Sequence, residues 1–217
     1  MKILITLVVC LTCSTGVFAQ GIATAIQTTM RILATQPDGS VSVGSGVVLP
    51  GERVATACHV VEGATEIKVS YKYVASPATL ARQDRARDLC VLGAPGLAAP
   101  AAKLARSTDL KAGDRLLAFS GAYGNDVRLM IGEVNEVHPM DGGAVIETSV
   151  PFVVGDSGGG LFNNEGELIG LLAFISGTPG EKRYAIPVEW LDADIEATRN
   201  TPFWKGNAAE LPAFLRP

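Results

Sequence analysis

The stretch that decides the fold and the chemistry of this chain is residues 155–160, Gly-Asp-Ser-Gly-Gly-Gly. A serine becomes a nucleophile when its hydroxyl is exposed and backbone N–H groups point at the oxyanion that develops beside it. Gly155 lets the backbone turn so that its own N–H and that of Ser157 converge, and the glycines after the serine leave room for a substrate. An ordinary glycine-rich turn has the same composition. Ser157 is therefore a candidate nucleophile, with Gly155 and Ser157 as candidate oxyanion donors.

The choice of a general base is narrow, because the chain holds only two histidines, His59 and His138. His59 belongs to the segment Thr-Ala-Cys-His-Val-Val, residues 56–61, at the end of a predicted strand that begins at Arg53. Histidine suits general-base work near neutral pH, although a lone histidine is more often structural. His138 precedes a proline in a predicted turn and is expected at the surface. His59 is therefore the candidate base.

A carboxylate partner for the base is indicated by the apolar run Leu-Cys-Val-Leu, residues 89–92. Asp88 stands directly before this run, so its carboxylate can be buried against the imidazole and hold its tautomer. Asp84 is a rival, and either residue could be an ordinary loop aspartate. Asp88 is preferred because the apolar run starts directly after it. The joint occurrence of His59, Asp88 and Ser157 in this order is more specific than any single motif.

Composition argues against several other classes of protein. The chain has 217 residues, 24 glycines and a formal net charge of −4. It has no basic run, so neither nucleic acid nor an anionic membrane is expected as a partner. The length suffices to bury a core without a metal or disulfide scaffold. No cofactor and no metal are expected, and the oligomeric state is not predicted.

The first residues have the pattern of a removable secretory signal. Lys2 supplies the positive charge, and residues 3–11 form an apolar run too short to span a bilayer. Val17 and Ala19 occupy the −3 and −1 positions of a cleavage site. An uncleaved anchor or a buried hydrophobic segment is the alternative. We predict a signal peptide over residues 1–19 and a secreted or periplasmic protein, without membrane contact after cleavage.

Short apolar runs separated by Gly- and Pro-containing turns predict a mostly β protein. The predicted strands cover residues 30–35, 41–49, 53–58, 66–73, 89–92, 115–119, 128–137, 144–150, 161–162, 168–175 and 183–186. Residues 93–113, rich in Ala, Pro and Gly, are the best candidate for a linker. Pro187 suits the first turn of a helix that would place Val188, Leu191 and Ile195 on one face. Two antiparallel barrels fit this order, but the count also fits a β-sandwich.

These motifs resemble those of the trypsin-like serine proteases, and most closely the bacterial branch that includes the HtrA-like proteases. The family pattern T-x-x-H-V-V is matched by residues 56–61, and G-[ND]-S-G-G by residues 155–159. D-L-A-V-L is matched by residues 88–92, with Cys90 in place of the alanine. Further matches lie at residues 44–48, 166–170 and 184–187, so the resemblance runs from about residue 41 to residue 187.

The resemblance implies an all-β fold of two six-stranded antiparallel β-barrels. Residues 20–105 would form the barrel that carries the base and its carboxylate, and residues 106–186 the barrel with the nucleophile. Residues 187–217 would form a C-terminal helix and a tail.

The implied activity is that of a serine endopeptidase acting on a protein or peptide. His59 would take the proton of Ser157, Asp88 would orient the imidazolium, and the N–H groups of Gly155 and Ser157 would hold the oxyanion. A pseudoprotease that only binds peptides is the first alternative. A zinc protein is the second; it would use His59 with Cys58 and Cys90, but adjacent strand residues face opposite ways and no fourth ligand is evident.

Alignment with the family also predicts a substrate pocket. Its residues are Pro151, Phe152, Val153, Val154, Ala173, Phe174 and Ile175. Pro151 takes the place of the trypsin pocket aspartate, and Ile175 falls where many relatives have glycine. This favours small or medium apolar P1 residues such as Ala or Val.

Three departures from the family stand out. The chain is too short to add a PDZ domain. Asp156 stands where HtrA-like proteases usually have Asn, so it needs a partner, either an Arg or Lys or an N-terminus near Ile22. Ala173 replaces a serine that many relatives carry near the triad aspartate.

The two cysteines outside the predicted signal, Cys58 and Cys90, are expected to form a disulfide. Cys58 precedes His59, and Cys90 lies two residues after Asp88. In this fold the backbone before the histidine passes close to the buried aspartate, which brings the pair within bridging distance. Two buried free thiols are the alternative.

Overall fold

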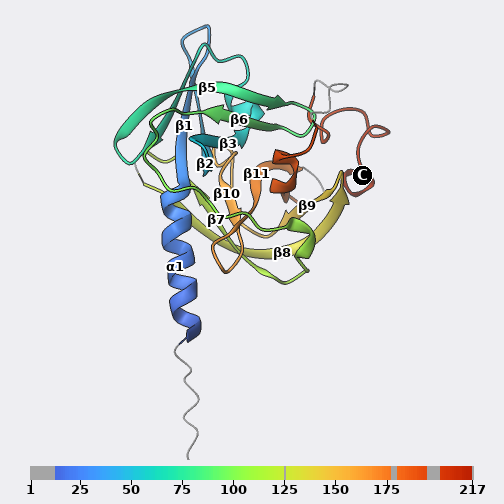
Figure 1. Cartoon of the computed structure of the whole chain (residues 1–217). Helices are drawn as coiled ribbons and strands as arrows, with labels where there is room; N and C mark the ends of the chain where they lie inside the picture. The colour runs from blue at the N-terminus through green and yellow to red at the C-terminus, as the bar shows by residue number, and fades with distance from the viewer. Residues whose placement is uncertain (1–12, 125, 177–179, 195–200, 217) are drawn as a thin grey trace, which may run out of the picture.

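The computed structural model describes residues 13–124, 126–176, 180–194 and 201–216. Two closed antiparallel barrels dominate it, one above the other in Figure 1. The first has the strand order β1-β2-β3-β6-β5-β4 and the second β10-β11-β12-β9-β8-β7. The predicted fold of two six-stranded barrels is therefore confirmed.

The first barrel consists of β1 (Thr29–Thr35), β2 (Val41–Leu49), β3 (Arg53–Ala57), β4 (Glu66–Tyr71), β5 (Val74–Asp84) and β6 (Leu89–Gly93). The second consists of β7 (Arg115–Ser120), β8 (Arg128–Met140), β9 (Gly143–Thr148), β10 (Gly160–Phe162), β11 (Leu168–Ser176) and β12 (Lys182–Pro187). The helices are α1 (Cys13–Thr28), α2 (Cys58–Val61) and the 3-10 helices η1 (Ser107–Asp109), η2 (Val188–Leu191) and η3 (Ala213–Leu215).

One strand, β5, was not predicted, since no strand was expected between residues 73 and 89. Of its 11 residues, only Ala78 and Asp84 are buried. The strand therefore lacks the alternation of apolar and polar residues that identifies a half-buried strand. It is held instead by its pairing with β4 and β6.

Each barrel has its own apolar core, and a third cluster of buried side chains joins the two. Val47 and Leu89 contribute to this cluster from the first barrel, and Phe119 and Phe162 from the second. The two phenyl rings pack edge to face, with centroids 5.5 Å apart. This continuous core fixes the barrels against each other, so residues from both can form one preorganised site.

The predicted C-terminal helix is largely absent from the described residues. Directly after Pro187 the chain forms the short 3-10 helix η2, which ends at Leu191, and Ile195 lies outside the described residues. The Arg82 guanidinium donates to the carbonyls of Trp190 (3.1 Å), Leu191 (2.6 Å) and Ala193. In a continuing α-helix these carbonyls would accept hydrogen bonds from N–H groups further along the chain. Here Arg82 takes their place as the donor and stabilises the non-helical conformation after η2.

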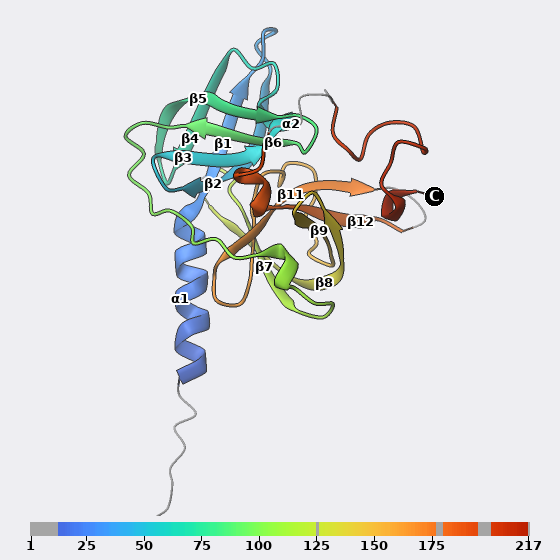
Figure 2. The same cartoon turned by 45° about the vertical axis from the view of Figure 1, so that its right-hand side comes forward.

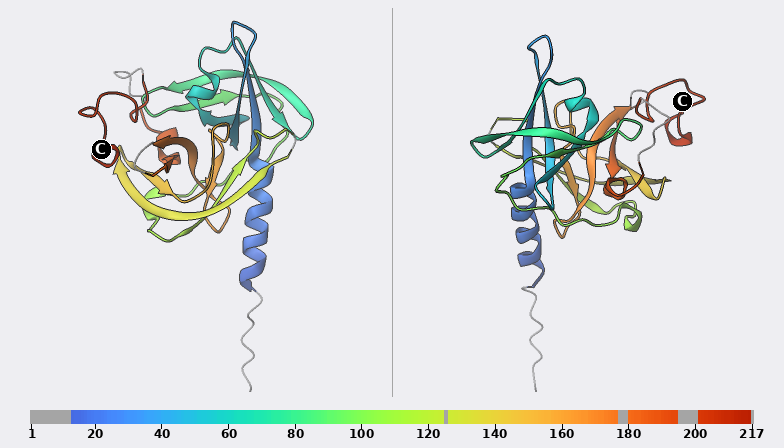
Figure 3. Two further views of the ribbon diagram at one scale, coloured as in Figure 1. Left: turned by 180° about the vertical axis from the view of Figure 1, so that it is seen from behind. Right: turned by 45° about the horizontal axis from the view of Figure 1, so that its top comes forward.

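At the other end of the chain, α1 extends away from the barrels (Figure 3) and runs through the predicted cleavage position after Ala19. Its last turn is packed on the protein: Ala25 is fully buried, and its carbonyl accepts hydrogen bonds from the hydroxyls of Thr28 and Thr29. None of the helices in the described ranges is long and apolar enough to cross a membrane. The signal peptide remains a prediction.

Candidate active site

The first barrel places His59 directly against Asp88. In the antiparallel pairing of β3 with β6, Ala57 lies opposite Leu89. The segment that follows Ala57 therefore meets Asp88, which precedes Leu89, at the end of the barrel. The Cys58 N–H donates to the Asp88 carbonyl over 2.9 Å, and the His59 N–H donates to Asp88 Oδ1 over 2.8 Å. One backbone–backbone hydrogen bond and one from a backbone N–H to the Asp88 carboxylate therefore hold the two segments together.

The side chains then form the short hydrogen bond that a triad requires. His59 Nδ1 lies 2.6 Å from Asp88 Oδ2. The Asp88 side chain is 1% exposed and that of His59 36% exposed. With Nδ1 donating to the carboxylate, Nε2 is the ring nitrogen left to accept a proton. Asp88 adopts a positive φ of 56°, an unusual conformation for a residue other than glycine, which its local hydrogen bonds stabilise.

The rival carboxylate, Asp84, is engaged elsewhere. It is fully buried, and its Oδ2 lies 3.0 Å from Arg87 Nη1 and 3.9 Å from Arg82 Nη2. The Arg87 N–H also donates to its Oδ1. Asp84 is therefore paired with Arg82 and Arg87, and Asp88 is the carboxylate beside the imidazole.

The predicted disulfide between Cys58 and Cys90 is confirmed, with the two Cα atoms 4.8 Å apart. It ties the start of α2 to β6, immediately beside His59 and Asp88. It also uses both sulfurs that the zinc alternative would need as thiolates.

The second barrel supplies the turn that carries Ser157. Gly155 has φ +101° and Gly158 φ +79°, both in the region that favours glycine. A side chain at Gly158 would place its Cβ 2.2 Å from the Ser45 carbonyl oxygen, so the turn can lie against β2 only because this residue is glycine. In the described part of the chain, the N–H groups of Gly155 and Ser157 have no hydrogen-bond partner. They are therefore available to an oxyanion.

Between these residues, Asp156 is fully buried and is paired with Arg128, whose Nη1 lies 3.2 Å from Asp156 Oδ2. The same oxygen accepts the Val153 N–H over 2.9 Å. Of the two partners that the sequence analysis left open, the structure shows the arginine. The pair anchors the serine turn from its buried side.

A cavity of about 260 Å³ brings the two barrels' residues together. It is lined by His59, Phe152, Val153, Val154, Ser157, Ala173, Phe174, Ile175, Trp204 and Lys205. All the predicted pocket residues are present except Pro151, which is exposed and whose carbonyl faces Arg128. Pro151 does not line this cavity, so its place in a substrate pocket stays a prediction.

Two lining residues, Trp204 and Lys205, were missed. The expectation of a C-terminal tail within residues 187–217 did not place these side chains, because the sequence carries no signal for where a tail packs. His138 was also misplaced: it is 8% exposed, in β8, and stacks on Phe214 of the tail with ring centroids 4.1 Å apart.

Comparison with known proteins agrees with this geometry. Residues 44–171 match the family described as trypsin-like peptidase domain. The chain therefore belongs to the trypsin-like peptidase family.

Several curated relatives of this chain are named as periplasmic serine endoproteases. A protein of Halomonas elongata named probable periplasmic serine endoprotease DegP-like is 35% identical over 157 residues, which are 68% of this chain and 33% of that protein. A protein of the same name from Pseudomonas savastanoi gives the same values. The chain thus spans about a third of the length of these curated relatives.

Solved structures give the same result. The HtrA-type protease AlgW with a tripeptide superposes with a TM-score of 0.71 at 27% identity, over 79% of this chain and 60% of that one. The Rv3671c protease from M. tuberculosis, in its active form, superposes with a TM-score of 0.72 over 82% of this chain and 85% of that one. Its 22% identity shows a shared fold alone.

Proposed function

We propose that this protein is a serine endopeptidase that hydrolyses peptide bonds through His59, Asp88 and Ser157. The observation that carries the proposal is the 2.6 Å hydrogen bond between His59 Nδ1 and Asp88 Oδ2, at the wall of a cavity that Ser157 also lines. The family and the peptide-bound HtrA-type neighbour support it.

The chemistry follows from the roles of the atoms. His59 Nε2 takes the proton of the Ser157 hydroxyl as Oγ attacks the peptide carbonyl. The N–H groups of Gly155 and Ser157 donate to the oxyanion, and Asp88 stabilises the imidazolium. His59 then gives the proton to the leaving amine, and water hydrolyses the acyl-enzyme by the same route.

The shape of the cavity favours a small or medium apolar P1 side chain. Phe152, Val153, Ala173 and Ile175 supply apolar walls, and no carboxylate of the described residues lines the cavity to attract Arg or Lys. A protein or peptide is thus the proposed substrate. The predicted signal and the relatives named periplasmic support action in the periplasm or outside the cell.

The proposal is tested by labelling the protein with a fluorophosphonate probe and by following cleavage of an unfolded protein such as casein. Ser157→Ala should lose labelling entirely, and its kcat should fall by about 10⁴- to 10⁶-fold, with an unchanged circular dichroism spectrum. Failure of the unmodified protein to react with the probe and to cleave casein would contradict the proposal and favour the pseudoprotease alternative.

A further inference from the structure

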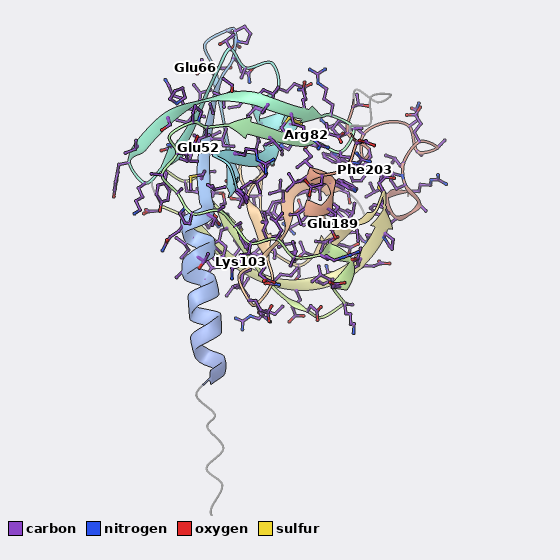
Figure 4. The ribbon with its side chains drawn as sticks, in the orientation of Figure 1. Glu52, Glu66, Arg82, Lys103, Glu189 and Phe203 are labelled. Carbon is purple, nitrogen blue, oxygen red and sulfur yellow. A yellow bond between two sulfur atoms is a disulfide. The ribbon has the colours of Figure 1, made fainter. Side chains whose placement is uncertain are left out.

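The C-terminal tail forms one wall of the cavity through Trp204 and Lys205, which follow the buried Phe203. Phe203 anchors this segment: it is 2% exposed, and its N–H donates over 2.8 Å to the carbonyl of Ala86, in the turn before Asp88. Its ring also packs edge to face on Trp190. Figure 2 shows the tail on the same side of the molecule as α2 and β11, and Figure 4 labels Phe203 there.

Trp204 is fixed by a stack of three aromatic rings. It lies parallel to Phe174 of β11, with centroids 4.1 Å apart and planes 10° apart. Phe174 in turn stacks on Tyr184 of β12, with centroids 4.8 Å apart. Burial, together with nearby Glu147, raises the pKa of Tyr184 to about 12, so this ring stays neutral. The stack holds Trp204 beside the cavity, and Lys205 follows directly.

Lys205 is the one residue with a permanent charge among the ten that line the cavity. The other lining residues are apolar except for His59 and Ser157. Across the described ranges of the chain, Lys205 has no ion pair. A cation without a counterion in a concave, mostly apolar site attracts an anionic group of a ligand.

The path of a substrate can be followed along β11. The pairing of β11 with β10 ends at Leu171, whereas its pairing with β12 continues to Ser176. Among the described residues, the part of β11 after Leu172 therefore has no strand partner on the side of the turn that carries Ser157, and an extended peptide can add there as a strand. A peptide with its P1 side chain beside Ser157 would then pass the Phe174–Trp204 stack with its preceding residues.

We propose that Lys205 is a specificity-determining residue that binds an acidic side chain of the substrate at one of the positions P2 to P4. This inference rests on the proposed function. The P1 side chain occupies the apolar walls next to Ser157, and a carboxylate from a preceding residue reaches the Lys205 ammonium over the indole of Trp204.

The test uses fluorogenic peptides with a fixed apolar P1 residue and with Glu, Gln or Lys at P2, P3 or P4 in turn. We expect Glu to exceed Gln in kcat/KM by about two- to fivefold at one position, because ion pairs at exposed sites contribute modestly. The difference should lie in KM and should vanish in 1 M salt, where charges are screened within about 3 Å. Lys205→Glu should reverse the preference to Lys.

Lys111→Glu is the matched control. Lys111 is exposed and lies outside the cavity, so the variant has the same net charge as Lys205→Glu but should keep the preference for Glu. The inference is overturned if Glu is favoured at none of the three positions, or if its advantage persists in Lys205→Glu. Probe labelling and casein cleavage separate the two proposals: if both occur without a charge preference, only the role of Lys205 fails.

Discussion

Replacing both disulfide cysteines, as Cys58→Ala/Cys90→Ala, should lower the free energy of unfolding without removing the active geometry. The bond joins residues 32 apart in sequence, so it closes a loop of about 33 residues in the unfolded chain. On the chain-entropy relation, opening such a loop costs about 3.7 kcal/mol at 25 °C. Both cysteines are buried, so the lost sulfur contacts add to this cost.

The active geometry should survive because the disulfide is one of several links at this point. The N–H groups of Cys58 and His59 donate to Asp88, and β3 remains paired with β6 from Arg53 to Ala57. We therefore expect kcat/KM within about threefold of the parent protein wherever the variant is folded, a modest change on the free-energy scale.

Urea unfolding followed by tryptophan fluorescence measures the effect. With a slope of about 1–3 kcal/mol per molar urea, the midpoint should fall by roughly 1–4 M. Dithiothreitol should shift the parent protein in the same direction and leave the double variant unaffected. A loss of stability under about 1 kcal/mol, or a large fall in kcat in the folded variant, would refute the reasoning.

Two further predictions concern the residues around the bond. Asp88→Asn should lower kcat by about 10⁴-fold while circular dichroism stays unchanged, because an amide no longer holds the productive tautomer of His59; near-parental turnover would show that Asp88 does not orient it. Gly158→Ala should destabilise the fold by about 2–5 kcal/mol in urea and impair turnover, since it combines a positive φ with overlap on the Ser45 carbonyl. Gly39→Ala is its control, because Gly39 has φ +83° but no heavy atom within 4 Å of the position that a Cβ would take. This variant should lose only about 1 kcal/mol of unfolding free energy. Equal losses in the two variants would show that overlap with the Ser45 carbonyl does not contribute.

The sequence predicted those features that depend on residues close together along the chain. The strand β2 has the predicted bounds, since its apolar residues are bracketed by turn residues. The candidate site depended on three short motifs, and the structure brings His59 and Asp88 into contact as they indicate. The Cys58–Cys90 bond followed from the positions of those motifs in the family fold.

Features that depend on distant contacts could not be predicted in the same way. The strand β5 is mostly exposed, so it carries no periodic signal. The helix expected after Pro187 is replaced by bonds from Arg82, which lies more than 100 residues earlier in the chain. His138 has a turn-like sequence context but is buried under Phe214. In each case the determining partner is remote in sequence.

The residues proposed for catalysis have local sequence motifs, whereas part of the cavity that would select the substrate depends on contacts between distant segments. The residues that we propose to act on the peptide bond lie in one strand pair and one turn, and each of these segments has a sequence motif. The cavity wall beside them comes from residues 152–154, from β11 and from the tail, and the Phe203 N–H joins the tail to the first barrel by donating to the Ala86 carbonyl. Substitutions in residues 203–205 can therefore change which peptides are bound without altering the geometry of His59 and Asp88.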